Sequence, residues 1–143
     1  MPKEDGWSKW GPEKYITSTL IENFADLTDN HQWIHEDHYR SEGDPYNGQI
    51  AHGLLLVALI PSILPDDGDL PPHSVRVIRG IDRLRLPSPV YPRNFVHTRV
   101  RRIATYAAQS GKGTIIERDV EVWAKARTCT KPAVACVLKM QYF

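Results

Sequence analysis

Two cysteines are present in the 143 residues, Cys129 and Cys136, and their spacing fits no metal site. A disulfide framework is therefore not expected, and a reducing, cytoplasmic location is predicted. The longest apolar run, residues 54–60, is too short to cross a bilayer. No basic stretch followed by an apolar one stands at the start, so no signal peptide is expected. We therefore expect a protein that does not act in a membrane. Its length is sufficient for one domain with a hydrophobic core.

Net charge is also nearly absent, at +1, but the two halves of the chain differ strongly in charge. Residues 1–72 hold four Lys/Arg and thirteen Asp/Glu, whereas residues 73–143 hold fourteen and four. Two interpretations stay open: the halves attract each other within or between subunits, or the basic half binds a phosphate-bearing ligand such as coenzyme A or phosphopantetheine. Nucleic acid is not expected, because no aromatic-and-basic motif accompanies the charge.

The first half of the chain predicts helices. Residues 1–15 are expected to form an irregular lead-in, and apolar residues at helical spacing predict a short amphipathic helix over 18–28. Residues 36–40 are expected to make a helical turn. Residues 51–64 are apolar on nearly every face, which predicts a buried helix, and Pro61 should kink or end it. Residues 65–72 are then expected to be an exposed acidic connection.

The second half changes to a period of two. Alternating apolar and polar residues predict four strands, roughly 75–86, 94–106, 113–126 and 132–143, joined by short connections. Helices followed by an antiparallel meander indicate an α+β domain, with the apolar helix covering one face of the sheet. Such a sheet leaves edge strands, which makes a symmetric homodimer plausible.

Four motifs carry a family resemblance. Residues 24–28 read FADLT, 31–35 read HQWIH, 50–53 read IAHG and 80–90 read GIDRLRLPSPV. Together, and in this order, they resemble the MaoC-like dehydratases, in particular the branch of nodulation protein N-like hydratases. The resemblance implies a single hot-dog domain over residues 1–143, in which an antiparallel sheet wraps a central helix and two copies pair. It also implies reversible hydration of a trans-2-enoyl thioester to a (3R)-hydroxyacyl thioester, carried by coenzyme A or an acyl carrier protein, without a cofactor or metal.

The resemblance assigns roles to residues of two segments. His35 aligns with the catalytic histidine, and the amide of Gly53, at the start of the apolar helix, is expected to bind the thioester oxygen. Substrate contacts are expected from the five neighbouring residues Asp29, Gln32, Trp33, Ala51 and His52. The principal role expected of His52 is to shape the start of the helix and bond to the backbone.

Asn30 stands where the family has its catalytic aspartate. A neutral amide can orient water but cannot act as a general base. Asn30 therefore represents a lost base, an isosteric replacement that traps substrate, or a paralogue recruited to other work. Asp29 could supply the carboxylate if the register of the loop slipped by one residue. A second departure is Pro61, which stands where some of these hydratases have a serine.

Several rival interpretations are open. An isomerase or cyclase of a biosynthetic pathway would need no strong carboxylate base. A non-catalytic acyl-binding protein would need no catalytic base of any kind. A hot-dog thioesterase is disfavoured, because residues 51–64 contain no acidic side chain. His35, His38 and Asp37 could hold a metal by spacing, but nothing else supports such a site. Arg83 and Arg85 are either a solvated strand face or contacts for coenzyme phosphates.

Overall fold

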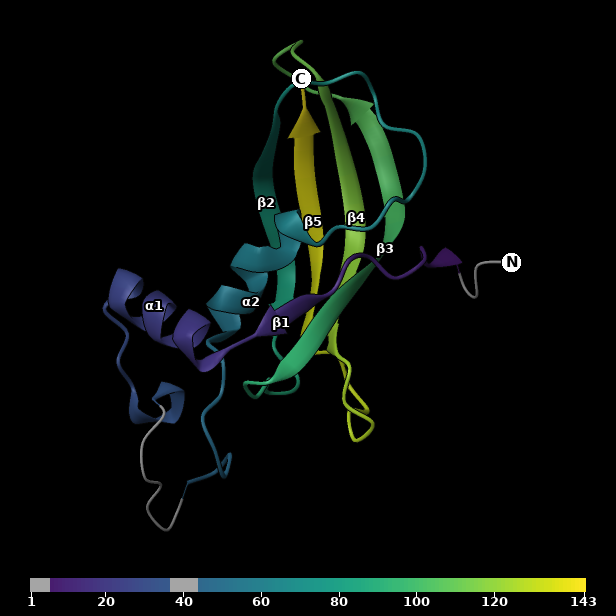
Figure 1. The fold of residues 1–143 in the computed structure, drawn as a ribbon. Helices are drawn as coiled ribbons and strands as arrows, with labels where there is room; N and C mark the ends of the chain where they lie inside the picture. The colour runs from purple at the N-terminus through teal and green to yellow at the C-terminus, as the bar shows by residue number, and fades with distance from the viewer. Residues whose placement is uncertain (1–5, 37–43) are drawn as a thin grey trace.

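Five antiparallel strands form one curved sheet, and the helices lie to one side of it (Figure 1). The computed structural model describes residues 6–36 and 44–143. The elements follow in the order β1 (Lys14–Ile16), α1 (Ser18–Thr28), the 3-10 turn η2 (Trp33–His35), α2 (Gly53–Leu59), the 3-10 turn η3 (Ile60–Ser62), β2 (Arg76–Arg85), β3 (Asn94–Ala107), β4 (Thr114–Ala124) and β5 (Val134–Tyr142). The predicted α+β fold is confirmed. No helix in the described part of the chain is long and apolar enough to span a membrane.

The order of strands differs from the predicted meander. The sheet runs β1-β3-β4-β5-β2, so the first long strand pairs with the last one. A period of two identifies a strand and its buried face, but it does not identify the neighbouring strand. Here the connection between η3 and β2 crosses the sheet and passes over its end, which delivers β2 to the far side of β5 (Figure 1).

The helix α1 begins and ends where the sequence predicts. The side chain of Thr17 caps it by accepting a hydrogen bond of 3.0 Å from the amide of Leu20. At the other end Asp29 adopts the left-handed conformation, with φ of 53°, and its amide bonds back into the last turn. Ile21 and Ala25 are buried. The chain therefore leaves α1 through a capped turn directly into residues 30–35.

The central helix α2 is shorter than the predicted 51–64. The amide of Ala51 donates to the carbonyl of Val90, so this residue is held outside the helix. At its other end α2 stops at Leu59, and the chain continues as the 3-10 turn η3, which contains Pro61. Proline has no amide proton to donate, so it cannot extend the α-helix. Three helix residues are buried, but Leu54 is 63% exposed, so the helix is not covered on every face. One apolar side of α2 remains open.

The lead-in is more ordered than predicted. Its last residues form β1, and the amides of Ser8 and Gly11 donate to carbonyls of β3, so the segment follows the free edge of that strand. The ring of Trp10 stacks on that of His97 with centroids 3.8 Å apart. The tryptophans of this segment thus cover polar and basic side chains of the sheet rather than apolar ones.

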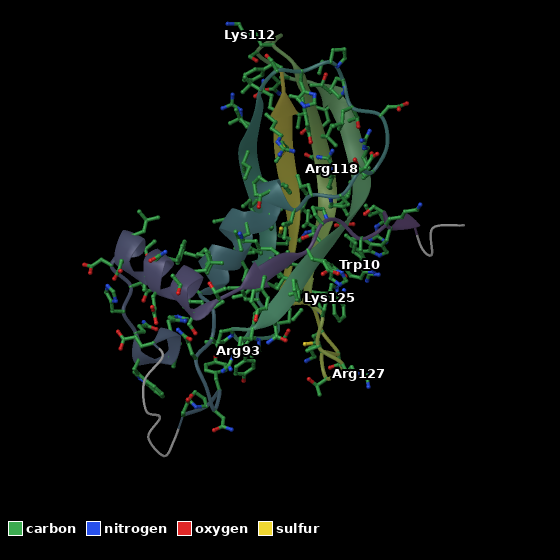
Figure 2. All side chains as sticks on the ribbon, viewed as in Figure 1. Trp10, Arg93, Lys112, Arg118, Lys125 and Arg127 are labelled. Atoms are coloured by element: carbon green, nitrogen blue, oxygen red, sulfur yellow. The ribbon has the colours of Figure 1, made fainter. Side chains whose placement is uncertain are left out.

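The acidic connection is not fully exposed, contrary to the prediction. The side chain of Asp67 is 5% exposed and accepts hydrogen bonds from Arg118 of β4 and Arg102 of β3. Arg118 lies midway along the sheet, 3% exposed, on the face that otherwise carries the apolar core (Figure 2). It also donates to the hydroxyl of Tyr142. The buried guanidinium attracts the carboxylate, and the pair fixes the connection against the sheet.

Candidate active site

The two segments of the family motif meet at the start of α2. The amide of Ile50 donates to the carbonyl of Ile34 over 3.0 Å, which joins the strand-like residues before α2 to the 3-10 turn η2. Gln49 adds a second tie, because its side chain donates to the carbonyl of His35 and accepts from the hydroxyl of Ser18. These bonds hold η2 against the N-terminus of α2. Sequence analysis missed Gln49, since a lone glutamine between glycine and isoleucine carries no pattern.

His35 is buried, and its ring is held by one bond. Nδ1 lies 2.9 Å from the carbonyl oxygen of Ile50. A carbonyl oxygen can only accept, so in the neutral ring Nδ1 carries the proton and Nε2 has a free lone pair. The backbone of the second motif segment thereby selects the tautomer in which Nε2 can accept a proton.

His52 lies directly against His35. The two rings stack with centroids 3.8 Å apart, and the ring of Phe24 packs against His52 at 5.0 Å. Nε2 of His52 lies 3.1 Å from the carbonyl oxygen of Asn30 and donates to it. Its Nδ1 is buried without a hydrogen-bond partner among the described residues. Burial lowers the pKa of His52, against the opposing effect of the bond to Asn30, so His52 stays neutral and acts as a spacer between loop and helix.

A cavity of about 260 Å³ opens beside these residues. His35, Gly53 and Ala51 line it together with Leu86 and Val90 and, among others, the hydroxyl-bearing residues Tyr46 and Ser88. Gly53 is the first residue of α2, where amides have no acceptor within the helix. A Cβ at this position would lie 2.3 Å from a methyl group of Leu86, so a larger residue would have to displace the Leu86 side chain from the wall. The two residues expected to catalyse, His35 and Gly53, thus share one cavity.

The other predicted site residues of the first segment lie away from that cavity, which Ile34 lines beside His35. Asp29, Gln32 and Trp33 are exposed and line none of it. Asn30 and His52 do not line it either; the backbone carbonyl of Asn30 accepts a hydrogen bond from His52 instead. No carboxylate is found among the described residues that line the cavity. The structure therefore brings together His35, Ala51 and Gly53, with His52 behind them, and leaves Asp29, Gln32 and Trp33 outside.

Residues 6–36 and 44–143 contain no metal-binding geometry. No group of three or more His, Cys, Asp or Glu side chains close enough to hold a metal ion occurs within these ranges. His38, Asp37 and most of the turn expected over 36–40 lie outside the described residues. Both cysteines are free thiols.

Known proteins share both the sequence and the fold of this chain. Residues 9–124 match the family described as MaoC like domain. The 3-hydroxyacyl-thioester dehydratase Z of Mycobacterium tuberculosis is 30% identical over 129 residues, which cover 89% of this chain and 82% of the relative. Nodulation protein N of Rhizobium meliloti is 38% identical over 100 residues, covering 68% of this chain and 60% of the relative.

Among solved structures, an (R)-hydratase of A. caviae involved in PHA biosynthesis superposes with a TM-score of 0.70 at 18% identity. The match covers 95% of this chain and 98% of that one. At this identity the likeness establishes the fold, which is the predicted hot-dog arrangement of a sheet around a central helix. Family match, relatives and fold agree, and the chain belongs to the MaoC-like dehydratase family.

Proposed function

We propose that this protein is an enoyl-thioester hydratase, or (3R)-hydroxyacyl dehydratase, whose usual carboxylate base is replaced by Asn30. One observation carries the proposal: His35, with its tautomer fixed by Ile50, and Gly53, the first residue of α2, line the same cavity. A proton acceptor and an oxyanion donor on one cavity are what addition of water to an activated acyl group requires.

In the proposed reaction Nε2 of His35 accepts a proton from water while the water oxygen bonds to the β-carbon of the enoyl group. Electron density moves through the double bond onto the thioester oxygen. Nε2 of His35 then returns its proton to the α-carbon as the carbonyl re-forms, which completes the addition of one water. The amide of Gly53 donates a hydrogen bond to that oxygen and stabilises the developing charge. Such a donor is worth on the order of 3 kcal/mol in the transition state.

A neutral Asn30 side chain cannot remove a proton from water, and residue 30 lies outside the lining of the cavity, on the other side of His52. The backbone carbonyl of Asn30 accepts a hydrogen bond from His52, and the His52 ring stacks on that of His35. Residue 30 is therefore connected to the proposed catalytic histidine through the side chain of His52. We therefore expect low hydratase activity from this protein and higher activity from the Asn30→Asp variant.

A second candidate function rests on the lack of a carboxylate among the described lining residues. A cavity whose polar side chains are His35, Tyr46 and Ser88 also suits an isomerase or cyclase, or a non-catalytic acyl-binding protein. The acyl substrate would in each case be carried as a thioester of coenzyme A or an acyl carrier protein.

We further propose a cytoplasmic homodimer that pairs through β2. This strand is an edge of the sheet, and it exposes the apolar side chains Ile78, Leu84 and its neighbour Leu86. Leu54 of α2 is also exposed. An unpaired edge strand beside an exposed apolar surface supports association of a second copy.

The test is hydration of a crotonyl thioester, followed as loss of enoyl absorbance, by the protein as it stands and by Asn30→Asp. Restoring the base should raise the turnover number by about two to four decades. Asp29→Asn is the matched control, since it removes the neighbouring carboxylate and leaves residue 30 unchanged. A hydratase scaffold gives a large gain with Asn30→Asp and no change with Asp29→Asn.

Other outcomes decide between the alternatives. A loss of activity in Asp29→Asn would identify Asp29 as the base and reverse the assignment of residue 30. If neither the protein nor Asn30→Asp turns over the thioester, the hydratase proposal fails for this substrate class.

A further inference from the structure

The outer face of the sheet, opposite α2, carries a second cavity that the proposed reaction does not use. Its volume is about 320 Å³. Its floor includes Ala135 and Val137 of β5. Its walls are formed by six large or charged side chains, Trp7, Arg83, Arg85, Arg101, Asp119 and Glu121.

Positive charge exceeds negative charge in this cavity. Asp119 is paired with Arg101 at 2.9 Å, and Glu121 is paired with Arg99 at 2.8 Å. These two carboxylates are therefore already neutralised. Arg83 and Arg85 are exposed, and neither has an ion-pair partner within residues 6–36 and 44–143. The cavity thus keeps two unmatched guanidinium groups, which suits a ligand with about two negative charges.

A β-bulge in β2 places both of these arginines on the outer face. Asp82 is opposite Val137 and Arg85 is opposite Ala135, so three residues of β2 span two of β5. Arg83 takes up the extra step with φ of 51°, an unusual conformation for a long side chain. In a regular strand Arg83 and Arg85 would face α2, because facing alternates from residue to residue. The strained residue is therefore what turns two charges toward the outer cavity.

Trp7 holds the opposite wall of the cavity in place. Its ring lies 4.7 Å from the guanidinium carbon of Arg101 and 4.5 Å from that of Arg99. These cation–π contacts fix two further arginines beside the unmatched pair. Arg101, held by Trp7 and paired with Asp119, therefore forms an ordered wall, and the unpaired charge of the cavity comes from Arg83 and Arg85.

We propose that this outer cavity binds a phosphate group, using the guanidinium groups of Arg83 and Arg85. The phosphate belongs either to a free anion or to the carrier of the thioester substrate, and the second source rests on the proposed function. The cavity lies near the reaction site along the chain, because Leu86, next to Arg85, lines the cavity of His35.

The first experiment is isothermal titration calorimetry of the full chain with inorganic pyrophosphate and, separately, coenzyme A. The double variant Arg83→Asn/Arg85→Gln removes both charges, and asparagine tolerates the left-handed backbone of residue 83. Arg127→Gln is the control, since Arg127 is exposed in the connection after β4 and lines no part of the cavity (Figure 2). The double variant should weaken binding of pyrophosphate at least tenfold, and the control should change it less than twofold.

The source of the phosphate is then separated by kinetics. A carrier subsite predicts that the double variant raises KM for a crotonyl-coenzyme A substrate but not for the same acyl group on N-acetylcysteamine, which has no phosphate. Unchanged KM values together with lost binding of pyrophosphate identify a free anion as the ligand. Calorimetry needs no turnover, so it stands even if the hydratase proposal fails. Absence of pyrophosphate binding at low salt, or equal binding by the double variant, overturns the proposal.

Discussion

Asp67→Asn should be one of the most destabilising single changes in this protein. The side chain of Asp67 accepts hydrogen bonds from Arg118 and Arg102, and Asp67 and Arg118 are both almost fully buried. Removing one partner of a buried pair leaves an uncompensated charge and costs about 3–5 kcal/mol. For a domain of this size that corresponds to a fall in Tm of roughly 10–17 °C. Thermal unfolding followed by circular dichroism at pH 7, at one fixed protein concentration, measures it.

The matched control is Asp69→Asn. Asp69 lies two residues further on and is exposed, and its contact with Arg102 uses the backbone carbonyl, which the substitution preserves. Its Tm should stay within about 2 °C of the unmodified protein. Equal and small shifts for both variants would refute the argument that the buried pair stabilises the connection.

The same pair predicts a dependence on pH. Burial alone would raise the pKa of Asp67, but hydrogen bonds from Arg118 and Arg102 outweigh it and hold the pKa below its usual value. The stabilisation is therefore present above the ordinary pKa of aspartate, 3.8, and is lost as the pH falls through the lower folded-state value. The difference in Tm between the protein and Asp67→Asn should be constant from pH 7 to 5 and shrink below pH 4. A difference that persists undiminished at pH 2 would contradict this reasoning.

Three further predictions concern the site and the edge of the sheet. Gly53→Ala places a methyl group against Leu86, which is half exposed and can move. The free energy of unfolding should therefore fall by only about 1 kcal/mol, while binding of an acyl thioester, measured by calorimetry, should weaken. Unchanged binding would contradict the role of Gly53 and Leu86 in the cavity wall. His52→Phe keeps a ring beside His35 but removes the hydrogen bond to the backbone carbonyl of Asn30, along with the nitrogen that has no partner. The free energy of unfolding should change by less than about 1 kcal/mol, while amide hydrogen exchange around Asn30 should become faster. Equal exchange rates would show that this bond does not hold the loop. Leu84→Lys adds a charge to the exposed edge strand and should convert a dimer to a monomer in light scattering, whereas a dimer that persists would place the interface elsewhere.

Local pattern was sufficient for much of the fold. Spacing of apolar residues predicted α1 over the same residues that the structure assigns, and alternation predicted all four long strands to within two residues. It also predicted the core-facing residues of β4, whereas in β5 the residues of both faces except Lys139 are buried. Both signals depend on neighbours in the chain, because helix and strand periods follow from backbone geometry alone.

Pairing and charge compensation could not be read in the same way. Strand order needed the path of the connection from η3 to β2, and the burial of Asp67 needed Arg118, which is 51 residues away. The shortened α2 reflects a bond from Ala51 to Val90 that no local pattern contains. Each of these depends on a partner that is distant in the chain.

The candidate site likewise has features that the sequence predicts and features that depend on tertiary contacts. The sequence by itself determined the family motifs, and it predicted His35, Gly53 and Asn30 as site residues. Only the tertiary structure decided that His35 and Gly53 share a cavity, that Ile50 fixes the tautomer of His35, and that a bulge turns two arginines outward. Residue types are written into the chain, but hydrogen-bond partners and shared cavities exist only once distant segments are packed together.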